Sequence, residues 1–438
     1  MRAHSIQQMP PRRSTRRRIG GKEARNEACS ALVQLPAPVQ LLVLTHLSVV
    51  QLWWARGISQ HFNRQAMEVL QGLPRLVSVG GSFWQGPGAL ATGPEVEVLS
   101  LATMRWSAGP RMATTASLPL PLPAPRGLHM VAAFGAGGRT TIVAAGGLNV
   151  CTTAGGDPMR ELQKQVVQWV PGSAAWASLP DMQVDRSRGA AVALGDGRLL
   201  VAGGWDEYGF TLDEEDEYVT RAAATVEVLA ADGSSWAAAA AMSIPRADAA
   251  AGLLASGRVI IAGGVGSDVD ETPMATVEQW DPVEDKWSLL PPMATARYGA
   301  AGCVLEDGRF AVLGGTDGDH IVRRDGEVFD PVAGTWQVLP DMTIGRATYS
   351  VVAVAGGMVA IGGHVDKSGG GPGGGVEADG GGAEAAAAEL FDTQSGRWIA
   401  LQHTMAVPRD AIARVVSVPA DAFAPPAPPA VVAAAGSP

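Results

Sequence analysis

The residues in this sequence that are best suited to chemistry are arginines that recur at intervals along the chain. Five of them follow a methionine by four positions, in "MQVDR", "MSIPR", "MATAR", "MTIGR" and "MAVPR", and a proline-rich insert separates Met112 from Arg126. A guanidinium is a planar fork of donors that matches carboxylate and phosphate groups. We expect these arginines to bind an acidic or phosphorylated segment or, alternatively, to hydrogen-bond neighbouring loop carbonyls. They are Arg126, Arg186, Arg246, Arg297, Arg346 and Arg409.

Aromatic and polar side chains that could assist the arginines follow pairs of glycines. Loops presented by a rigid scaffold often carry function, so these side chains are candidates for stacking and polar contacts with a captured segment. The residues expected to bind a substrate beside the arginines are Trp84, Trp205, His320 and His364, with Phe83, Asn149 and Asp317 as neighbours.

The sequence offers no set of residues arranged for catalysis or metal binding. Cys29, Cys151 and Cys303 lie far apart and lack metal-ligand spacing, and Cys303 sits in an apolar strand typical of a core. The acidic run at 213–217 matches no calcium-binding loop and is expected to be a solvated loop. We therefore expect no catalytic residue, no metal and no cofactor.

The arginines belong to a unit that occurs six times. Each unit has an apolar run ending in two glycines, a short alternating strand, one tryptophan, and then the methionine and arginine. Four apolar runs per unit predict a four-stranded sheet, with Asp-Gly or Ser-Gly at its tight hairpins. The glycines and tryptophans are expected to build this sheet rather than bind a ligand. The glycine pairs begin at Gly80, Gly146, Gly203, Gly263, Gly314 and Gly362, and the tryptophans are Trp106, Trp176, Trp236, Trp287, Trp336 and Trp398.

This series resembles the Kelch repeat family over roughly residues 75–418. The glycine pairs are 66, 57, 60, 51 and 48 residues apart, near the ~50 of a Kelch blade with insertions. The resemblance implies an all-β six-bladed propeller, in which four-stranded antiparallel blades surround a channel. It also implies that arginines at such positions meet acidic side chains of a captured protein.

The first unit lacks its leading strand, and the chain ends with an unmatched copy of that strand, "RDAIARVVSV", at 409–418. We expect this segment to form the innermost strand of the first blade and to close the ring, so that no sheet edge is left open.

Strand alternation places two sets of connections on one face of the predicted propeller. These are the loops after the glycine pairs and the segments from methionine to arginine. They include the longest connections, such as 205–221 and the glycine-rich 364–387. This face, called the loop face below, is the predicted binding face.

Residues 31–72 have a different composition and predict three short helices, because apolar residues recur at helical spacing from Val39 to Phe62. The segment resembles the F-box, beginning with Leu35 and Pro36 and containing "ARGISQHF" toward its end. It departs from the F-box pattern at Pro38, Ser48, Gln51 and Phe62.

The F-box resemblance implies docking on the SKP-family adaptor that links such proteins to a cullin ubiquitin ligase. The alternative is that these helices only pack against the side of the propeller. The residues that match apolar F-box positions form the expected adaptor-binding set, some of them in the helical core and some at the interface. They are Leu35, Pro36, Val39, Val43, Leu44, Leu47, Leu52 and Trp53.

Charge is uneven along the chain. The first 30 residues carry eight basic and two acidic side chains, in a chain whose net charge is −10. We expect residues 1–30 to be a disordered basic arm, which could be a nuclear signal, a nucleic-acid contact, a transit peptide or only a solvated tail. Residues 419–438 are expected to be a disordered tail. No apolar run reaches the roughly 18 residues of a membrane span, and no signal peptide is expected.

These features predict a protein of the cytoplasm, the nucleus or both, without membrane or nucleic-acid partners. The predicted function is that of a substrate-recognition subunit of an SKP-cullin-F-box ubiquitin ligase, which is not itself an enzyme. One alternative is a Kelch-repeat scaffold without ligase coupling. A less favoured one is a Kelch-type sugar-acting enzyme.

Overall fold

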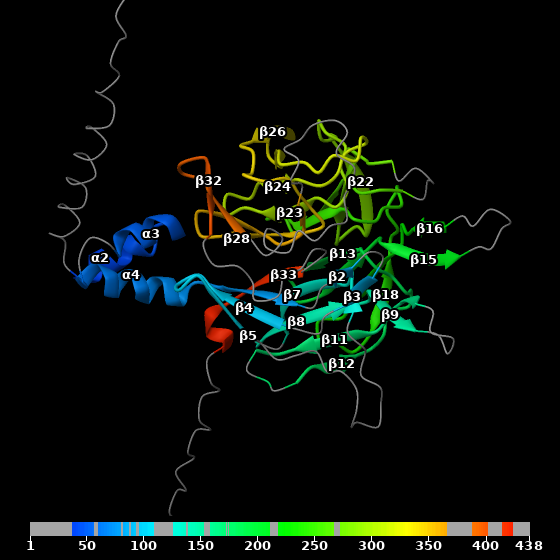
Figure 1. Cartoon of the computed structure of the whole chain (residues 1–438), viewed down its shortest axis with the longest axis horizontal. Coiled ribbons are helices and arrows are strands. Elements are labelled where there is room, and N and C mark those ends of the chain that lie inside the picture. The colour runs from blue at the N-terminus through cyan, green and yellow to red at the C-terminus, as the bar shows by residue number, and fades with distance from the viewer. Residues whose placement is uncertain are drawn as a thin grey trace, which may run out of the picture. The chain divides into compact units, whose positions relative to one another are not determined.

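A computed structural model describes residues 37–56, 60–79, 82–86, 89–92, 96–108, 126–136, 139–152, 158–171, 173, 175–210, 218–266, 272–365, 388–401 and 414–423. The chain divides into two compact units, residues 1–69 and residues 70–438. The first unit is helical and the second is built from strands (Figure 1). Each unit is described by itself.

The helical unit contains α2 (Ala37–Leu44), α3 (Val49–Ala55) and α4 (Gln60–Gly72). Ser48 and Gln51 form a reciprocal cap at the start of α3. The Ser48 amide donates to Gln51 Oε1 over 2.8 Å, and the Gln51 amide donates to Ser48 Oγ over 3.2 Å. This pair satisfies two amides that would otherwise lack partners at the helix start. Both residues depart from the F-box pattern, and the cap is their structural role.

Within the described residues, the second unit contains six antiparallel sheets of four strands, which are the blades of a propeller. From the innermost strand outward, blade 1 is β33 (Arg414–Val418), β1 (Arg75–Val79), β4 (Val96–Ser100) and β5 (Arg105–Ala108). Blade 2 is β7 (Met130–Ala136), β8 (Arg139–Ala145), β11 (Val166–Trp169) and β12 (Ala177–Leu179). Blade 3 is β13 (Ala190–Ala193), β14 (Leu199–Ala202), β17 (Val226–Leu229) and β18 (Trp236–Ala239).

The other three blades follow the same plan. Blade 4 is β19 (Ala250–Leu253), β20 (Val259–Ala262), β21 (Val277–Asp281) and β22 (Lys286–Leu290). Blade 5 is β23 (Ala301–Val304), β24 (Phe310–Leu313), β25 (Gly326–Asp330) and β26 (Thr335–Leu339). Blade 6 is β28 (Ser350–Val354), β29 (Gly357–Ile361), β31 (Ala388–Asp392) and β32 (Arg397–Ala400).

The innermost strands form a closed ring. Each contacts the innermost strand of the next blade, in the order β33, β7, β13, β19, β23, β28 and back to β33. In Figure 1 these strands occupy the middle of the unit and outer strands such as β12, β22, β26 and β32 lie around them. Of the segment expected to close the ring, 409–418, the structure describes 414–418, and these residues pair antiparallel with β1 from Arg75↔Val418 to Val79↔Arg414.

The tail after β33 differs from the expectation of disorder from residue 419. Ala420–Phe423 forms a 3-10 turn, and the ring of Phe423 lies 6.2 Å from that of Trp169 on blade 2. The guanidinium of Arg75 lies 4.6 Å from the centre of the Phe423 ring. An aromatic ring held in this way ties the end of the chain to blades 1 and 2.

Glycine pairs and tryptophans build the blades, as their repetition indicates. At Gly203, φ is +64°, and a Cβ atom there would collide with the carbonyl oxygen of Arg246, so only glycine fits. The outer-strand tryptophans join neighbouring blades, because the indole of Trp236 donates to the Pro180 carbonyl over 2.9 Å and that of Trp287 to the Ala240 carbonyl over 2.8 Å.

The loops after the glycine pairs of blades 1 to 3 contain strands that the sequence did not predict. Blade 1 adds β2 (Ser82–Gly86) with β3 (Ala89–Thr92), blade 2 adds β9 (Leu148–Thr152) with β10 (Pro158–Leu162), and blade 3 adds β15 (Trp205–Phe210) with β16 (Tyr218–Ala222). β3 contacts β9, and β10 contacts β15. Three adjoining hairpins therefore rise from the loop face over blades 1 to 3. The short strand β6 (Arg126–Gly127) pairs with β9, and β27 (Arg346–Ala347) pairs with β30 (His364–Val365).

Candidate functional site: the loop face of the propeller

Four of the recurring arginines are buried between blades. Arg186, Arg246, Arg297 and Arg346 are 0%, 1%, 0% and 0% exposed. In each case one guanidinium nitrogen donates to the carbonyl of the first glycine of a pair. These bonds run from Arg186 to Gly203 over 2.9 Å, from Arg246 to Gly263 over 2.8 Å, from Arg297 to Gly314 over 2.8 Å and from Arg346 to Gly362 over 2.8 Å.

A buried glutamate of the following blade receives each of these arginines. Its carboxylate lies on the third strand, at the second residue of the alternating strand segment. The pairs are Arg186 with Glu227 at 2.7 Å, Arg246 with Glu278 at 2.8 Å, Arg297 with Glu327 at 3.4 Å and Arg346 with Glu389 at 3.2 Å. These four contacts are called the inter-blade braces below.

The glutamate of a brace also binds the chain that follows the methionine. Glu278 accepts the amides of Ser243 and Ile244 over 2.8 and 3.2 Å, and Glu227 accepts those of Gln183 and Val184. Burial lowers the pKa of Arg246, and Glu278 offsets part of this effect by favouring the charged form. A buried ion pair is costly to break, because removing one partner leaves an uncompensated buried charge.

The braces correct the expectation that the six arginines face a ligand at the channel mouth. Arg186, Arg246, Arg297 and Arg346 are covered by protein and bonded to the adjacent blade, so they cannot also bind a substrate. The alternative reading, in which the arginine hydrogen-bonds loop carbonyls, describes these four. The side chain of Arg126 and all of Arg409 lie outside the described residues, and their role stays a prediction.

The structure also contradicts the expectation that Trp205 contacts a substrate. It is 3% exposed and packs with Ala222, Ala247 and Val265, so it belongs to the core. His364 is half-buried and His320 is exposed. The side chains of Trp84, Phe83 and Asn149 lie outside the described residues. His320 and His364 therefore remain available for contact with a partner.

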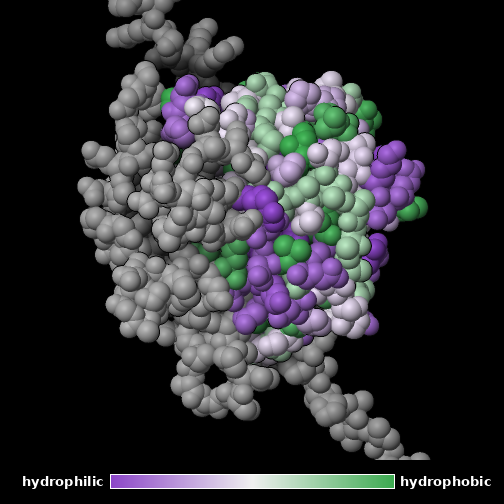
Figure 2. All heavy atoms as spheres, turned by 90° about the vertical axis from the view of Figure 1, so that its right-hand side faces the viewer, coloured by the Kyte–Doolittle hydropathy of each residue, from purple (hydrophilic) through white to green (hydrophobic). Residues whose placement is uncertain are grey.

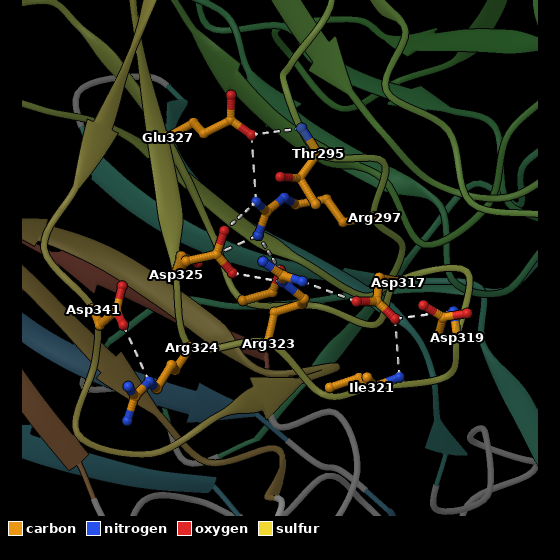
Figure 3. Close-up of polar contacts among 11 residues, drawn as sticks. Thr295, Arg297, Asp317, Asp319, Ile321, Arg323, Arg324, Asp325, Glu327 and Asp341 are labelled. Atoms are coloured by element: carbon orange, nitrogen blue, oxygen red, sulfur yellow. Dashed lines mark hydrogen bonds and ion pairs between the residues drawn. The ribbon is translucent and has the colours of Figure 1, made fainter. Parts of the chain in front are cut away.

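Ion pairs and hydrogen bonds hold the loop around Asp317 and Arg323 in place (Figure 3), and His320 belongs to this loop, where its amide donates to the Asp317 carbonyl. Arg323 donates from Nε to Asp325 over 2.7 Å and from a terminal nitrogen to Asp317 over 3.0 Å. Asp317 Oδ1 accepts the amides of Asp319 and Ile321, each over 3.0 Å. Partial burial acts to raise the pKa of Asp317, but hydrogen bonds from the loop backbone and from Arg323 outweigh it and hold that pKa below its usual range.

This loop, residues 316–325, is therefore ordered before any partner arrives. The backbone of His320 takes the left-handed conformation, with φ at +58°, which is uncommon for a residue with a side chain. A loop that is already held in one conformation loses less entropy on binding. The loop is a candidate contact surface. The sequence analysis named Asp317 in it, but did not predict the ion pairs of Arg323 with Asp317 and Asp325.

A series of backbone hydrogen bonds links five consecutive repeats on the loop face. Two positions after each arginine, φ is positive in every described repeat, from +53° at Asp248 and Thr348 to +61° at Gly299. The amides at these positions bond to the preceding repeat: Arg188 to Leu128, Asp248 to Arg188, Gly299 to Asp248 and Thr348 to Gly299, over 2.7 to 2.9 Å. Arg188, whose side chain is 30% exposed, also pairs with Asp248 at 2.7 Å.

The side of the molecule drawn in Figure 2 carries hydrophilic side chains near the middle of its described surface, and strongly hydrophobic ones occur singly or in small groups. Within the described residues, no group of three or more histidine, cysteine, aspartate or glutamate side chains could hold a metal. Burial raises the pKa of Cys303 to about 12, so its thiol is not poised as a nucleophile.

Comparison with known proteins bears on the repeats. The Kelch motif model matches residues 250–294 and 296–343. The chain contains Kelch motifs. The first matched Kelch segment covers blade 4, and the second includes the strands of blade 5 and the Arg297–Glu327 brace. The motif thus coincides with the structural repeat.

A second comparison finds Kelch-like protein 15 of Danio rerio, which is 40% identical over 82 residues. That segment is 19% of this chain and 13% of the zebrafish protein, so the two are compared over a small part of either. No F-box domain is detected in the helical unit. In the described part of the chain, no helix is long and apolar enough to cross a membrane.

The expected adaptor-binding residues of the helical unit differ in burial. Leu44 and Leu52 are both 0% exposed and form its core, which corrects their assignment as contacts. Val39 is 40% exposed, and Val43, Leu47 and Trp53 are half-buried. Leu35 and Pro36 lie outside the described residues. Leu42 is 60% exposed and lies beside Val39 on α2. It was not among the expected contacts, although its helical spacing from Val39 can be read in the sequence.

Proposed function

We propose that this chain is the substrate-recognition subunit of an SKP-cullin-F-box ubiquitin ligase. In this proposal the helical unit docks on the adaptor and the loop face of the propeller captures a protein substrate. The observation that supports adaptor docking is the pair Val39 and Leu42 on α2, which are 40% and 60% exposed although the helices around them enclose a packed core. Exposed apolar side chains grouped on one short helix favour a protein partner.

Capture of a protein by the propeller is supported by the shape of the loop face. Hairpins rise over blades 1 to 3, while the loop at 316–325 of blade 5 is short and held by ion pairs. A rigid surface on which hairpins stand beside a short loop suits a folded or extended polypeptide. The preordered loop that contains His320 is the part of this face that we assign to substrate contact, together with His364.

The adaptor proposal is tested with the double variant Val39→Asp and Leu42→Asp. Both side chains are exposed, so the helical core should stay intact while the apolar surface is lost. We expect the variant to lose co-purification of an SKP-family adaptor by at least about tenfold, which corresponds to roughly 1.4 kcal/mol.

Arg64→Glu is the matched control, because it makes the same change of two charge units at an exposed position of α4. The control should retain the adaptor. If the wild-type chain recovers no adaptor, the ligase proposal fails, and a Kelch-repeat scaffold without ligase coupling becomes the better description.

A further inference from the structure

The outermost strand of blade 5, β26 (Thr335–Leu339), has one edge that pairs with no other described strand. It is the last strand of its sheet and lies at the outer margin of the propeller (Figure 1). In an antiparallel ladder the amides and carbonyls of alternate residues point away from the neighbouring strand, so such an edge offers hydrogen-bonding groups to another chain. The edge of β26 is therefore a candidate surface for the addition of a strand.

The side chains of β26 make this edge apolar. Val338 is 80% exposed, and Trp336, two residues earlier on the same face of the strand, is half-buried. The indole of Trp336 donates to the Pro291 carbonyl over 2.8 Å, and its ring centre lies 5.1 Å from that of Phe329, so the ring is held in one orientation. A fixed ring beside an exposed valine gives the edge an apolar surface that another chain can cover.

The other outer strands carry features that discourage pairing with another chain, and charged side chains on an edge strand are one such feature. The first residues of β5, β22 and β32 are basic, namely Arg105, Lys286 and Arg397. β12 and β18 are uncharged, but they are shorter and their exposed residues are alanines and one serine. Among the described outer strands, β26 alone is five residues long, uncharged and apolar at its exposed edge.

The sequence of β26 is complementary to itself. If two copies pair antiparallel about a two-fold axis at Gln337, each Trp336 lies opposite Val338 of the other copy and the two Gln337 side chains face each other. An aromatic residue opposite a β-branched one is a favourable cross-strand pair, and two side-chain amides can hydrogen-bond to each other. Asp341, the first charged residue after the strand, falls opposite Ala333 in this register and meets no like charge.

We propose that two copies of this chain associate through their β26 strands, which joins two four-stranded blades into one continuous antiparallel sheet. The partner is a second copy because the two-fold register forms the tryptophan–valine pair twice from one surface. The paired strands are antiparallel, so the loop faces of the two propellers point in opposite directions and neither is covered. The association does not depend on the function proposed above.

The paired edges are short, so the association should be weak. Stable protein interfaces bury roughly 1,200 to 2,000 Å², and one pair of five-residue strands covers less than this. We expect a dimer that forms at about 10 to 100 µM protein and dissociates on dilution.

Sedimentation velocity of the full-length protein from about 1 to 200 µM measures this association. Val338→Lys should weaken it by at least about tenfold, because it places a charge within the paired edge. Leu289→Lys is the matched control, since Leu289 is 65% exposed and, like Val338, pairs with the brace glutamate of its own blade. The control should associate as the wild type does.

The position of the two-fold axis is tested with single cysteine substitutions under mild oxidation. Gln337→Cys should give a covalent dimer that reductant reverses, because directly opposite residues of an antiparallel pair lie ~4.5 to 5.5 Å apart between Cα atoms, within the reach of a disulfide. Ser288→Cys is the control at the corresponding exposed position of β22. It should give no more covalent dimer than the wild type.

A protein that stays monomeric over the whole concentration range overturns the proposal. An association that Val338→Lys leaves unchanged, or that Leu289→Lys weakens equally, also overturns it, and so does equal cross-linking of Gln337→Cys and Ser288→Cys. Each variant should keep the melting transition of the wild type, because the replaced side chains are exposed. None of these measurements involves the adaptor or a substrate, so failure of the ligase proposal would leave their outcome unchanged.

Discussion

At the scale of single residues, the inter-blade brace explains why an arginine recurs in this chain. Arg246 and Glu278 are separated by 32 positions in sequence, yet their side chains meet at 2.8 Å with 1% and 0% exposure. The carboxylate also holds two amides of the segment that follows the methionine. One glutamate thus fixes a guanidinium and a loop at the same time, which ties adjacent blades together.

We expect Glu278→Gln to lower the free energy of unfolding by about 3 to 5 kcal/mol, because it leaves the buried Arg246 without its counter-charge. Urea denaturation followed by tryptophan fluorescence measures this change. The control is Asp196→Asn, which breaks a pair with Arg198 whose side chains are 36% and 52% exposed. An exposed pair contributes at most about 1 kcal/mol. Equal losses in the two variants would contradict the role given to the brace.

At the scale of elements, β33, the last strand among the described residues, completes the first blade. β33 pairs with β1 over five residues and contacts the innermost strands β7 and β28 on either side. The turn after it places Phe423 against Trp169. The two ends of the propeller sequence therefore meet within one sheet, and removing β33 would expose the edge of β1.

Truncation after Pro408 should therefore give a protein that aggregates or unfolds at a clearly lower temperature. Truncation after Phe423 should leave the melting temperature unchanged, because β33 and the Phe423 contact are kept. A chain that ends at Pro419 should fall between the two, since it keeps the strand and loses the ring contact. Differential scanning fluorimetry and size-exclusion chromatography measure these outcomes. A soluble and equally heat-resistant protein ending at Pro408 would show that β33 does not close the ring.

At the scale of the whole molecule, the chain has two compact units with different surfaces. The helical unit exposes the apolar side chains of Val39 and Leu42. The propeller has a loop face on which hairpins stand over blades 1 to 3 beside shorter loops. Two units with separate contact surfaces can bind two partners at once. This is the arrangement that a substrate adaptor requires under the proposed function.

Deletion of residues 31–72 should separate the two kinds of partner. In affinity purification with mass spectrometry, the truncated chain should lose the adaptor and the cullin and keep the proteins bound by the propeller. The melting transition of the propeller should persist, because its ring is closed by its own strands. Simultaneous loss of every partner while the propeller stays folded would contradict the division of roles between the units.

The sequence by itself determined the repeat and its consequences for the backbone. Glycine pairs, alternating strands and single tryptophans in a constant order predicted six four-stranded blades, and the unmatched strand near the end predicted that the chain returns to blade 1. These features are local, since a positive φ or a two-residue turn depends on a few neighbouring residues. The three hairpins over blades 1 to 3 were not predicted, because their strand sequences do not recur from one repeat to the next.

Only the tertiary structure decided what the arginines do. Their position near the loop face followed from strand alternation, but exposure depends on which side chains of the next blade face them. Glu227 lies 41 residues from Arg186, and the register between blades brings the two together. The same register shows that Val167 of blade 2 stands where the other described blades have a glutamate. Sequence periodicity reports which residues recur, whereas contacts between distant strands decide whether a recurring charge is neutralised within the fold or left for a partner.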